Sequence, residues 1–144
     1  MTIDAKIFEL EYSGDSSKYV WKLPSGNGLV SGIDRLAQQV AKSLLTTPGS
    51  DLRFPQWGGG AEGIPPIMHD STEIVSKDTN DIMFAVSKVE SDIIASQQRN
   101  PVPSNEALLS LDVVDIELVD LSNVTLFIRI VTADKVDTKL ELNV

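Results

Sequence analysis

The sequence has no cysteine and only one histidine, and both scarcities limit the chemistry open to it. Without cysteine there is no disulfide framework and no thiol nucleophile, so a reducing compartment is the simpler expectation. The histidine, His69, is followed by Asp70 and Ser71. Consecutive residues rarely converge on one reacting atom, and a single histidine among scattered carboxylates makes a poor metal site. We therefore expect no catalytic triad, no metal and no cofactor, and an ordinary loop position for His69.

Basic residues and long apolar runs are also scarce. The chain has 12 Lys and Arg against 21 Asp and Glu, and its net charge is −9. A phosphate-binding surface needs a basic patch, and no Lys/Arg cluster occurs, which argues against a nucleic-acid partner. No apolar run approaches the roughly 18 residues of a membrane span, and the N-terminus lacks a charged-then-apolar signal. The expected location is the cytoplasm, with no membrane partner.

What the sequence does contain is enough apolar material for one domain. It has 144 residues, of which 42% are hydrophobic, and this suits a single core. Alternating residues over 3–12 and 19–23, with turn-forming residues over 13–17 between them, predict an N-terminal β-hairpin. The segment 24–28, rich in Pro and Gly, predicts a surface loop.

A first helix is predicted to start after Ser31, which with Asp34 resembles a capping box. Apolar residues then recur at helical spacing and form one stripe toward the core: Ile33, Leu36, Ala37, Val40, Ala41, Leu44 and Leu45. The intervening polar residues are expected to face water: Gln38, Gln39, Lys42 and Ser43. Pro48 lacks an amide donor and disfavours helical geometry at Thr47, so the helix must end there.

A second helix is predicted over about 80–97. Its apolar stripe consists of Ile82, Ala85, Val86, Val89, Ile93 and Ile94. Residues 97–105 contain two prolines and predict an extended connector. Together the two helices precede a region with a different period.

Beyond the connector the apolar period changes from 3.6 to 2, which predicts strands. Leu111 and Val113 alternate, and the frame then shifts by one residue, which suggests a bulge near 113–114. A long strand over 124–131 and a last strand over 136–144 follow. The sequence thus predicts an α+β fold: two main helices packed on a small, mostly antiparallel sheet that ends in a C-terminal β-meander, with an N-terminal hairpin extension.

Two motifs are compatible with an enzymatic function, but the sequence around each of them favours a structural explanation. Residues 58–63 satisfy G-x-G-x-x-G, but a dinucleotide site needs a strand before the motif and a helix after it, and Pro-rich segments flank it instead. The alternative is a turn in which glycines allow close backbone approach. Glu90 and Asp92 are candidate acids for glycoside hydrolysis, but they point in different directions on a helix and are explained as solvated charges.

The stretch from 33 to 58 resembles a known pattern. A helix carrying Gln leads into Leu44-Leu45-Thr46-Thr47-Pro48-Gly49, and Arg53-Phe54-Pro55-Gln56-Trp57-Gly58 follows. This is similar to the baseplate wedge or sheath-initiator family of contractile phage tails (gene-25-like and W-like proteins), which has relatives in type VI secretion baseplates. Two details depart from the family. Ser50 separates Pro-Gly from Asp51, and Gln97-Gln98-Arg99 stands where many members have Glu-Pro-Arg, so the wedge contacts of that triplet are not carried over.

The resemblance implies a structural role for the segment after the first helix. We expect a rigid elbow in which proline fixes the path, glycine permits close approach, and Phe54 and Trp57 anchor it in the core or in a neighbouring subunit. Its residues are Thr46, Pro48, Gly49, Arg53, Phe54, Pro55, Trp57 and Gly58. The wedge-like domain spans 29–144, and residues 1–28 are the hairpin extension.

The resemblance also implies partners and a place of assembly. The protein is expected in the virion tail baseplate, assembled in the host cytoplasm, in six copies that contact the tail sheath protein and baseplate wedge proteins, with the tail tube or hub as further neighbours. A C-terminal edge strand would accept a sheath strand by β-augmentation. The residues assigned to it are Val136, Thr138, Lys139, Leu140, Leu142 and Val144. The alternatives are another small tail-completion or soluble binding module and, third, a glycan hydrolase.

Overall fold

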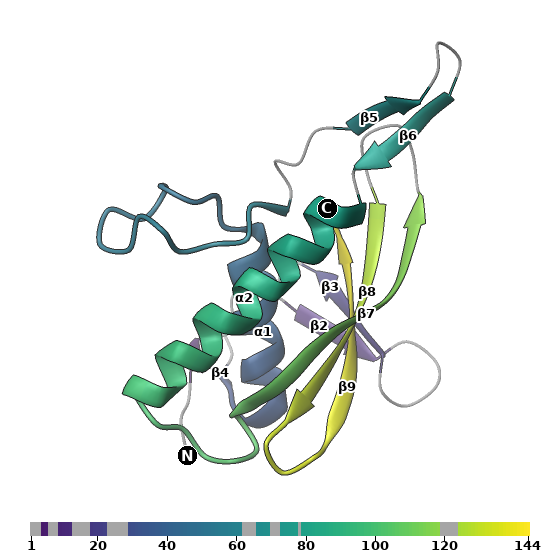
Figure 1. Ribbon diagram of the computed structural model, residues 1–144. Helices are drawn as coiled ribbons and strands as arrows, with labels where there is room; N and C mark the ends of the chain where they lie inside the picture. The colour runs from purple at the N-terminus through teal and green to yellow at the C-terminus, as the bar shows by residue number, and fades with distance from the viewer. Residues whose placement is uncertain are drawn as a thin grey trace.

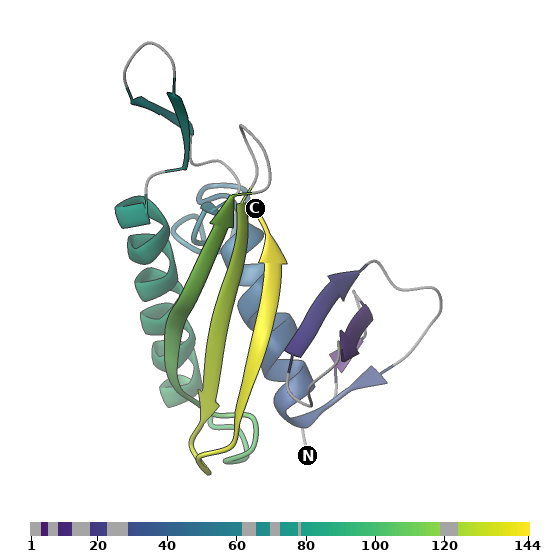
Figure 2. The same cartoon turned by 90° about the vertical axis from the view of Figure 1, so that its right-hand side faces the viewer.

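Two helices cover one face of a five-stranded sheet (Figures 1 and 2). The computed structural model describes the residues 4–5, 9–12, 18–22, 29–61, 66–69, 73–77, 79–118 and 124–144. The helices are α1 (Gly32–Leu45) and α2 (Thr79–Arg99). In spatial order the strands of the sheet are β2 (Glu9–Tyr12), β3 (Lys18–Lys22), β9 (Asp137–Asn143), β8 (Val124–Thr132) and β7 (Leu108–Leu118). The predicted α+β fold is confirmed.

The C-terminal meander and the N-terminal hairpin both form as predicted. Strand β8 pairs antiparallel with β7 on one side and with β9 on the other. Strands β2 and β3 pair antiparallel from Glu9↔Lys22 to Tyr12↔Tyr19. The first alternating run is not one strand, however. Its beginning forms β1 (Asp4–Ala5), which pairs with β4 (Leu29–Val30) just before α1.

The prediction that the C-terminal strand lies at the sheet edge is wrong. Strand β3 pairs in parallel with β9, from Lys18↔Lys139 to Val20↔Glu141, so β9 lies between β8 and β3. The two edges of the sheet are β7 and β2. Alternation along a strand reports which side chains face the core, but it carries no information about which backbone lies beside the strand. That information resides in the hairpin at the other end of the chain.

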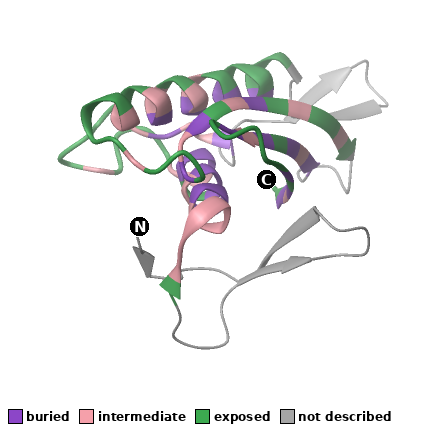
Figure 3. Cartoon of the chain, turned by 90° about the horizontal axis from the view of Figure 1, so that it is seen from below, coloured by how far each residue is buried: buried purple, intermediate pink, exposed green. Residues whose placement is uncertain are grey.

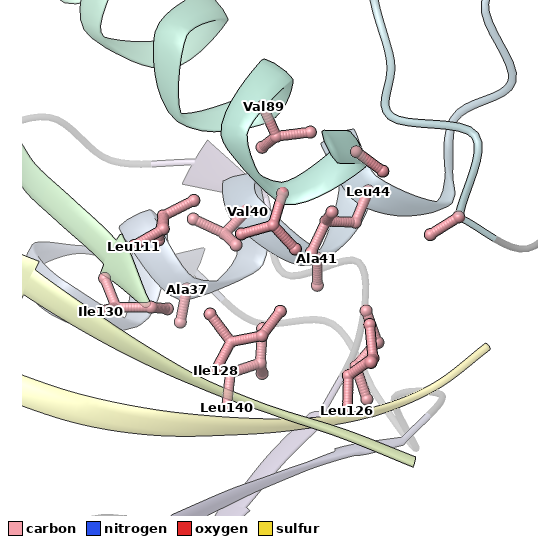
Figure 4. Packing of buried hydrophobic residues seen from close by; sticks show 14 of the residues in the cluster. Ala37, Val40, Ala41, Leu44, Val89, Leu111, Leu126, Ile128, Ile130 and Leu140 are labelled. Carbon is pink, nitrogen blue, oxygen red and sulfur yellow. The ribbon is translucent and has the colours of Figure 1, made fainter. Parts of the chain in front are cut away.

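The core lies between the sheet and the helices, and α1 is at its centre (Figures 3 and 4). The predicted strand over 124–131 corresponds to β8, whose inward face is fully buried and consists of Val124, Leu126, Ile128 and Ile130. In Figure 4, Ala37, Val40 and Ala41 of α1 lie toward this face, and Val89 of α2 approaches α1 from above. The predicted bulge in β7 is also present, as a register shift between Val113 and Asp115.

Both helices follow their predicted stripes, with two corrections on α1. Gln38 and Ser43 were expected to face water, but each is only 2% exposed. At Ser43 the chain after α1 folds back onto the end of this helix, since Gly59 donates its amide to the Ser43 carbonyl oxygen. Helix periodicity identifies the face toward the sheet and gives no indication of a second covering segment.

A further hairpin was not predicted. Strands β5 (Pro66–His69) and β6 (Glu73–Lys77) pair antiparallel and project from the body at the N-terminal end of α2 (Figures 1 and 2). The backbone of His69 pairs with Glu73 in this hairpin, so its expected loop position is wrong. Asp70 and Ser71 lie outside the described residues. Among the helices that the structure describes, none is long and apolar enough to cross a membrane.

Candidate functional site

The elbow, defined here as residues 46–60, begins where α1 ends. Thr46 occupies the C-cap: its amide donates to the Lys42 carbonyl oxygen at 3.0 Å, and its hydroxyl donates to the same oxygen at 2.7 Å. Ser50 closes the next turn, because its amide and hydroxyl both donate to the Thr47 carbonyl oxygen. The Pro-Gly pair therefore sits inside a hydrogen-bonded turn directly after the helix.

The three glycines bring the elbow back onto α1. Gly59 donates its amide to the Ser43 carbonyl oxygen at 2.9 Å, and Gly60 donates to that of Thr46 at 3.0 Å. Gly58 has φ +113°, and a Cβ there would lie 2.2 Å from the Thr46 carbonyl oxygen. A side chain is therefore excluded at Gly58 both by conformation and by space. The glycines serve the close approach of two backbone segments, which was one of the two interpretations of the motif.

Lys88 of α2 fixes the other side of the elbow. Its ammonium group donates to the carbonyl oxygens of Gln56 at 2.6 Å and Gly58 at 2.9 Å, and it pairs with Asp92 at 2.9 Å. Hydrogen bonds of a charged group are stronger than neutral ones. One side chain thus ties the elbow to α2, and no motif in the sequence indicates this contact.

The two aromatic residues of the elbow have different environments. Trp57 is half-buried and packs against the hydrophobic core, whereas Phe54 is 62% exposed. Asp51 shapes the turn before them by accepting the amides of Arg53 and Phe54 at 2.8 and 3.3 Å. Trp57 is therefore an anchor within this protein, and Phe54 remains available on the surface beside Leu52, which is 96% exposed.

The described residues of both enzymatic motifs contact other parts of the fold. Helix α1 precedes the glycines and strand β5 follows them, which is the reverse of the order a dinucleotide site requires. Glu90 accepts the amide of Leu111 at 2.7 Å, and Asp92 pairs with Lys88, so both carboxylates already bind parts of the fold. No group of three or more potential metal-binding His, Asp or Glu side chains occurs among the described residues.

The C-terminal strand presents few side chains to a partner. Thr138, Leu140, Leu142 and Val144 are buried in the protein's own core, which corrects the expectation that Leu140 and Leu142 would contact a partner. Leu140, Leu142 and Val144 belong to the same hydrophobic cluster as the buried residues of α1, and Figure 4 shows Leu140 among them. Lys139 is exposed and Val136 is 52% exposed. Any added strand would have to recognise β9 mainly through its backbone.

A groove of about 590 Å³ lies between α1, the elbow and the C-terminal end of α2. Its charged lining residues are Arg35, Lys42, Asp51 and Arg99, and Phe54 and Trp57 contribute its aromatic surface. We refer to it as the elbow groove. The sequence analysis did not single out its basic residues, although Arg35 and Lys42 lie seven positions apart on the polar face of one predicted helix.

Glu106, which is 1% exposed, is a second residue that the sequence analysis missed. Its carboxylate accepts the Gly32 amide at 2.9 Å and lies 3.7 Å from the Arg35 guanidinium. Ser31 occupies the N-cap position as predicted but makes no side-chain capping hydrogen bond, so the proposed capping box is wrong. A carboxylate from the connector before β7 replaces it at the positive end of the helix dipole.

Comparison with known proteins adds no relative: no family model, no curated protein and no solved structure matches this chain.

Proposed function

We propose that this protein is a structural baseplate subunit of a contractile tail, which joins the baseplate wedge to the sheath and templates the first sheath ring at β9. The geometry of the elbow supports a structural role. The resemblance rests on residues 33–58. In the structure these residues form most of α1, end it at Thr46 and return the chain to the same helix. Residues that fix the path of the backbone are more typical of an assembly protein than of a catalytic site.

The observation that carries the proposal is the asymmetry between the two sides of β9. On one side β9 pairs with β8 in antiparallel register from Thr125↔Asn143 to Val131↔Asp137. On the other side, among the described residues, β3 pairs with it in parallel from Lys18↔Lys139 to Val20↔Glu141. Parallel pairs are slightly less stable per residue than antiparallel pairs. Strand β3 is therefore the neighbour that a partner strand can replace.

The revised mechanism is a strand exchange rather than addition to an open edge. A sheath arm takes the position of β3 beside β9, and the buried side chains of β9 stay in the core throughout. Each main-chain hydrogen bond contributes only about 0.5–1.5 kcal/mol net. A sheath strand that pairs along more of β9 than β3 does would therefore gain a few such bonds, and the exchange would be favourable without large side-chain contacts.

Deleting the last strand would not test this mechanism. Leu140, Leu142 and Val144 are core residues, so truncation after Asp134 would be expected to unfold the domain whatever its function. A reversible disulfide between β3 and β9 is a better test. Because the sequence has no cysteine, only the introduced pair can form this bond. Lys18 and Lys139 are register partners, and neighbouring strands lie about 4.7–4.9 Å apart, within the reach of a disulfide.

The experiment compares baseplates that carry Lys18→Cys/Lys139→Cys in oxidised and reduced form. We expect oxidised baseplates to fail to nucleate the sheath and reduction to restore nucleation. The matched control is Arg129→Cys/Lys139→Cys, which locks β8 to β9, a pairing that the exchange leaves intact. Normal nucleation on oxidised Lys18→Cys/Lys139→Cys baseplates would contradict the strand exchange.

A simple assay distinguishes the hydrolase alternative from this proposal. The purified protein should not clear peptidoglycan. Glu90→Gln should reduce stability instead, because it weakens the acceptor for the Leu111 amide. Clearance that disappears in Glu90→Gln or Asp92→Asn, with the fold retained, would replace the structural proposal by an enzymatic one.

A further inference from the structure

The floor of the elbow groove is one polar stripe of α1. Arg35, Gln38, Gln39 and Lys42 recur at the i, i+3, i+4 and i+7 positions of a helix face, and all four line the groove. Gln38 lies at the bottom and is 2% exposed, whereas Lys42 is exposed at the rim. The α1 side of the groove is therefore polar and can form hydrogen bonds.

The charge of the groove is opposite to that of the protein. Among the described residues, three cations, Arg35, Lys42 and Arg99, line it together with one carboxylate, Asp51. The whole chain has the reverse balance, with 21 acidic and 12 basic residues. Lys42 and Arg99 each lie in the last turn of a helix, where a cation is favourable. That preference explains their positions along the helices but not their convergence with Arg35 on one groove.

The three cations differ in how far the protein itself neutralises them. Within the part of the chain that the structure describes, no ion pair involves Lys42 or Arg99. Arg35 pairs with Glu106 only at 3.7 Å, and its Nε is buried without a hydrogen-bond partner among the described residues. Asp51 is engaged with two backbone amides of the elbow. The groove thus retains positive charge that a ligand can neutralise.

An apolar surface flanks this charge. Phe54 is 62% exposed on the elbow wall, and half-buried Trp57 stands beside it in the same lining. Phe54 contributes little to the protein's own core, so its position on the groove wall is available for a ligand. Exposed aromatic residues next to cations are typical anchors of protein interfaces.

We propose that the elbow groove binds an acidic segment of a partner protein, with carboxylates placed against Lys42, Arg99 and Arg35 and an apolar side chain against Phe54. The groove lies on the helical side of the molecule, whereas strand exchange at β9 uses the edge beside β3. The inference therefore goes beyond the proposed function and can succeed or fail independently of it. A charged groove of this kind confers specificity and faster association more than raw affinity.

The test uses the full-length protein and a fluorescein-labelled hexapeptide, Glu-Glu-Phe-Glu-Glu-Asp, followed by fluorescence anisotropy. We expect binding with a Kd below about 1 mM at low salt, weakening as ionic strength rises because surface charges are screened. The analogue with Gln and Asn in place of the acids should bind at least about tenfold more weakly, which corresponds to about 1.4 kcal/mol. Equal binding of the two peptides would overturn the proposal.

A pair of charge-matched variants locates the site. Lys42→Glu/Arg99→Glu should reduce peptide affinity at least about tenfold, whereas Lys135→Glu/Lys139→Glu, which changes the net charge equally outside the groove, should stay within about twofold. All four residues are exposed, so both variants are expected to fold. Phe54→Ala should weaken binding severalfold.

Three results would overturn the proposal. They are equal loss in the two double variants, absence of binding by the natural sequence, and self-association of the protein that disappears only in Lys42→Glu/Arg99→Glu. The last result, measured by sedimentation, would identify a second copy of this chain as the occupant.

Discussion

Gly58 and Thr46 lie so close that no side chain fits between them: a Cβ on Gly58 would stand 2.2 Å from the Thr46 carbonyl oxygen. This contact joins the end of α1 to the end of the elbow. The Thr46 carbonyl oxygen in turn accepts the amide of Gly60, so backbone groups of the two segments bind each other directly. The elbow depends on glycine at this position for the space as well as for the conformation.

Gly58→Ala should therefore destabilise the protein more than Gly49→Ala. Both glycines have positive φ, +113° and +89°, but a Cβ on Gly49 meets nothing within 4 Å. The conformational strain common to both is about 1–3 kcal/mol. Gly58→Ala should cost about 2 kcal/mol more, because a backbone carbonyl must move, and urea midpoints measure the difference. Equal losses in the two variants would show that the close approach contributes nothing.

The two aromatic residues of the elbow should contribute very differently to the stability of the protein. Trp57→Ala should cost about 2–4 kcal/mol of unfolding free energy, somewhat less than for a fully buried aromatic residue, because Trp57 packs on the core but is only half-buried. Phe54→Ala should stay within about 0.5 kcal/mol, as expected of an exposed residue. Thermal unfolding of both variants measures this contrast. A large loss in Phe54→Ala would mean that the elbow wall depends on its side chain.

Glu106 should stabilise the fold in two ways, as a hydrogen-bond acceptor and as a negative charge. Glu106→Ala removes the acceptor for the Gly32 amide and leaves the Arg35 guanidinium without its carboxylate, at a cost of about 2–4 kcal/mol. Glu106→Gln keeps an acceptor for the amide and should lose less than half as much. Urea unfolding measures both variants, and identical losses would assign the whole effect to the charge.

The helices and the meander could be predicted because their information is local. The spacing of Ile82, Val86 and Val89 identifies the buried face of α2, and the frame shift after Val113 identifies the bulge. Each of these signals is contained within a few residues. For the same reason the end of α1 was predicted, since Pro48 cannot continue a helix.

What could not be predicted depends on residues far apart in the chain. Glu106 caps α1 across a separation of 74 residues, and its type gives no sign of that contact. Ser43 is buried at the point where Gly59 returns to α1, and β9 is interior because β3 lies beside it. The elbow groove also depends on segments far apart in the chain. Two helices and a loop bring Arg35, Lys42 and Arg99 together, and none of these segments alone indicates a site.

Imaging of an assembled contractile tail that contains this chain, at a resolution that traces strands, tests the central claim most directly. The account predicts six copies between the baseplate wedge and the first sheath ring, with a sheath strand beside Lys139–Glu141 in the place where β3 lies in the isolated protein. A baseplate that lacks this chain, or a first sheath ring that joins it elsewhere while β3 remains beside β9, would contradict the account.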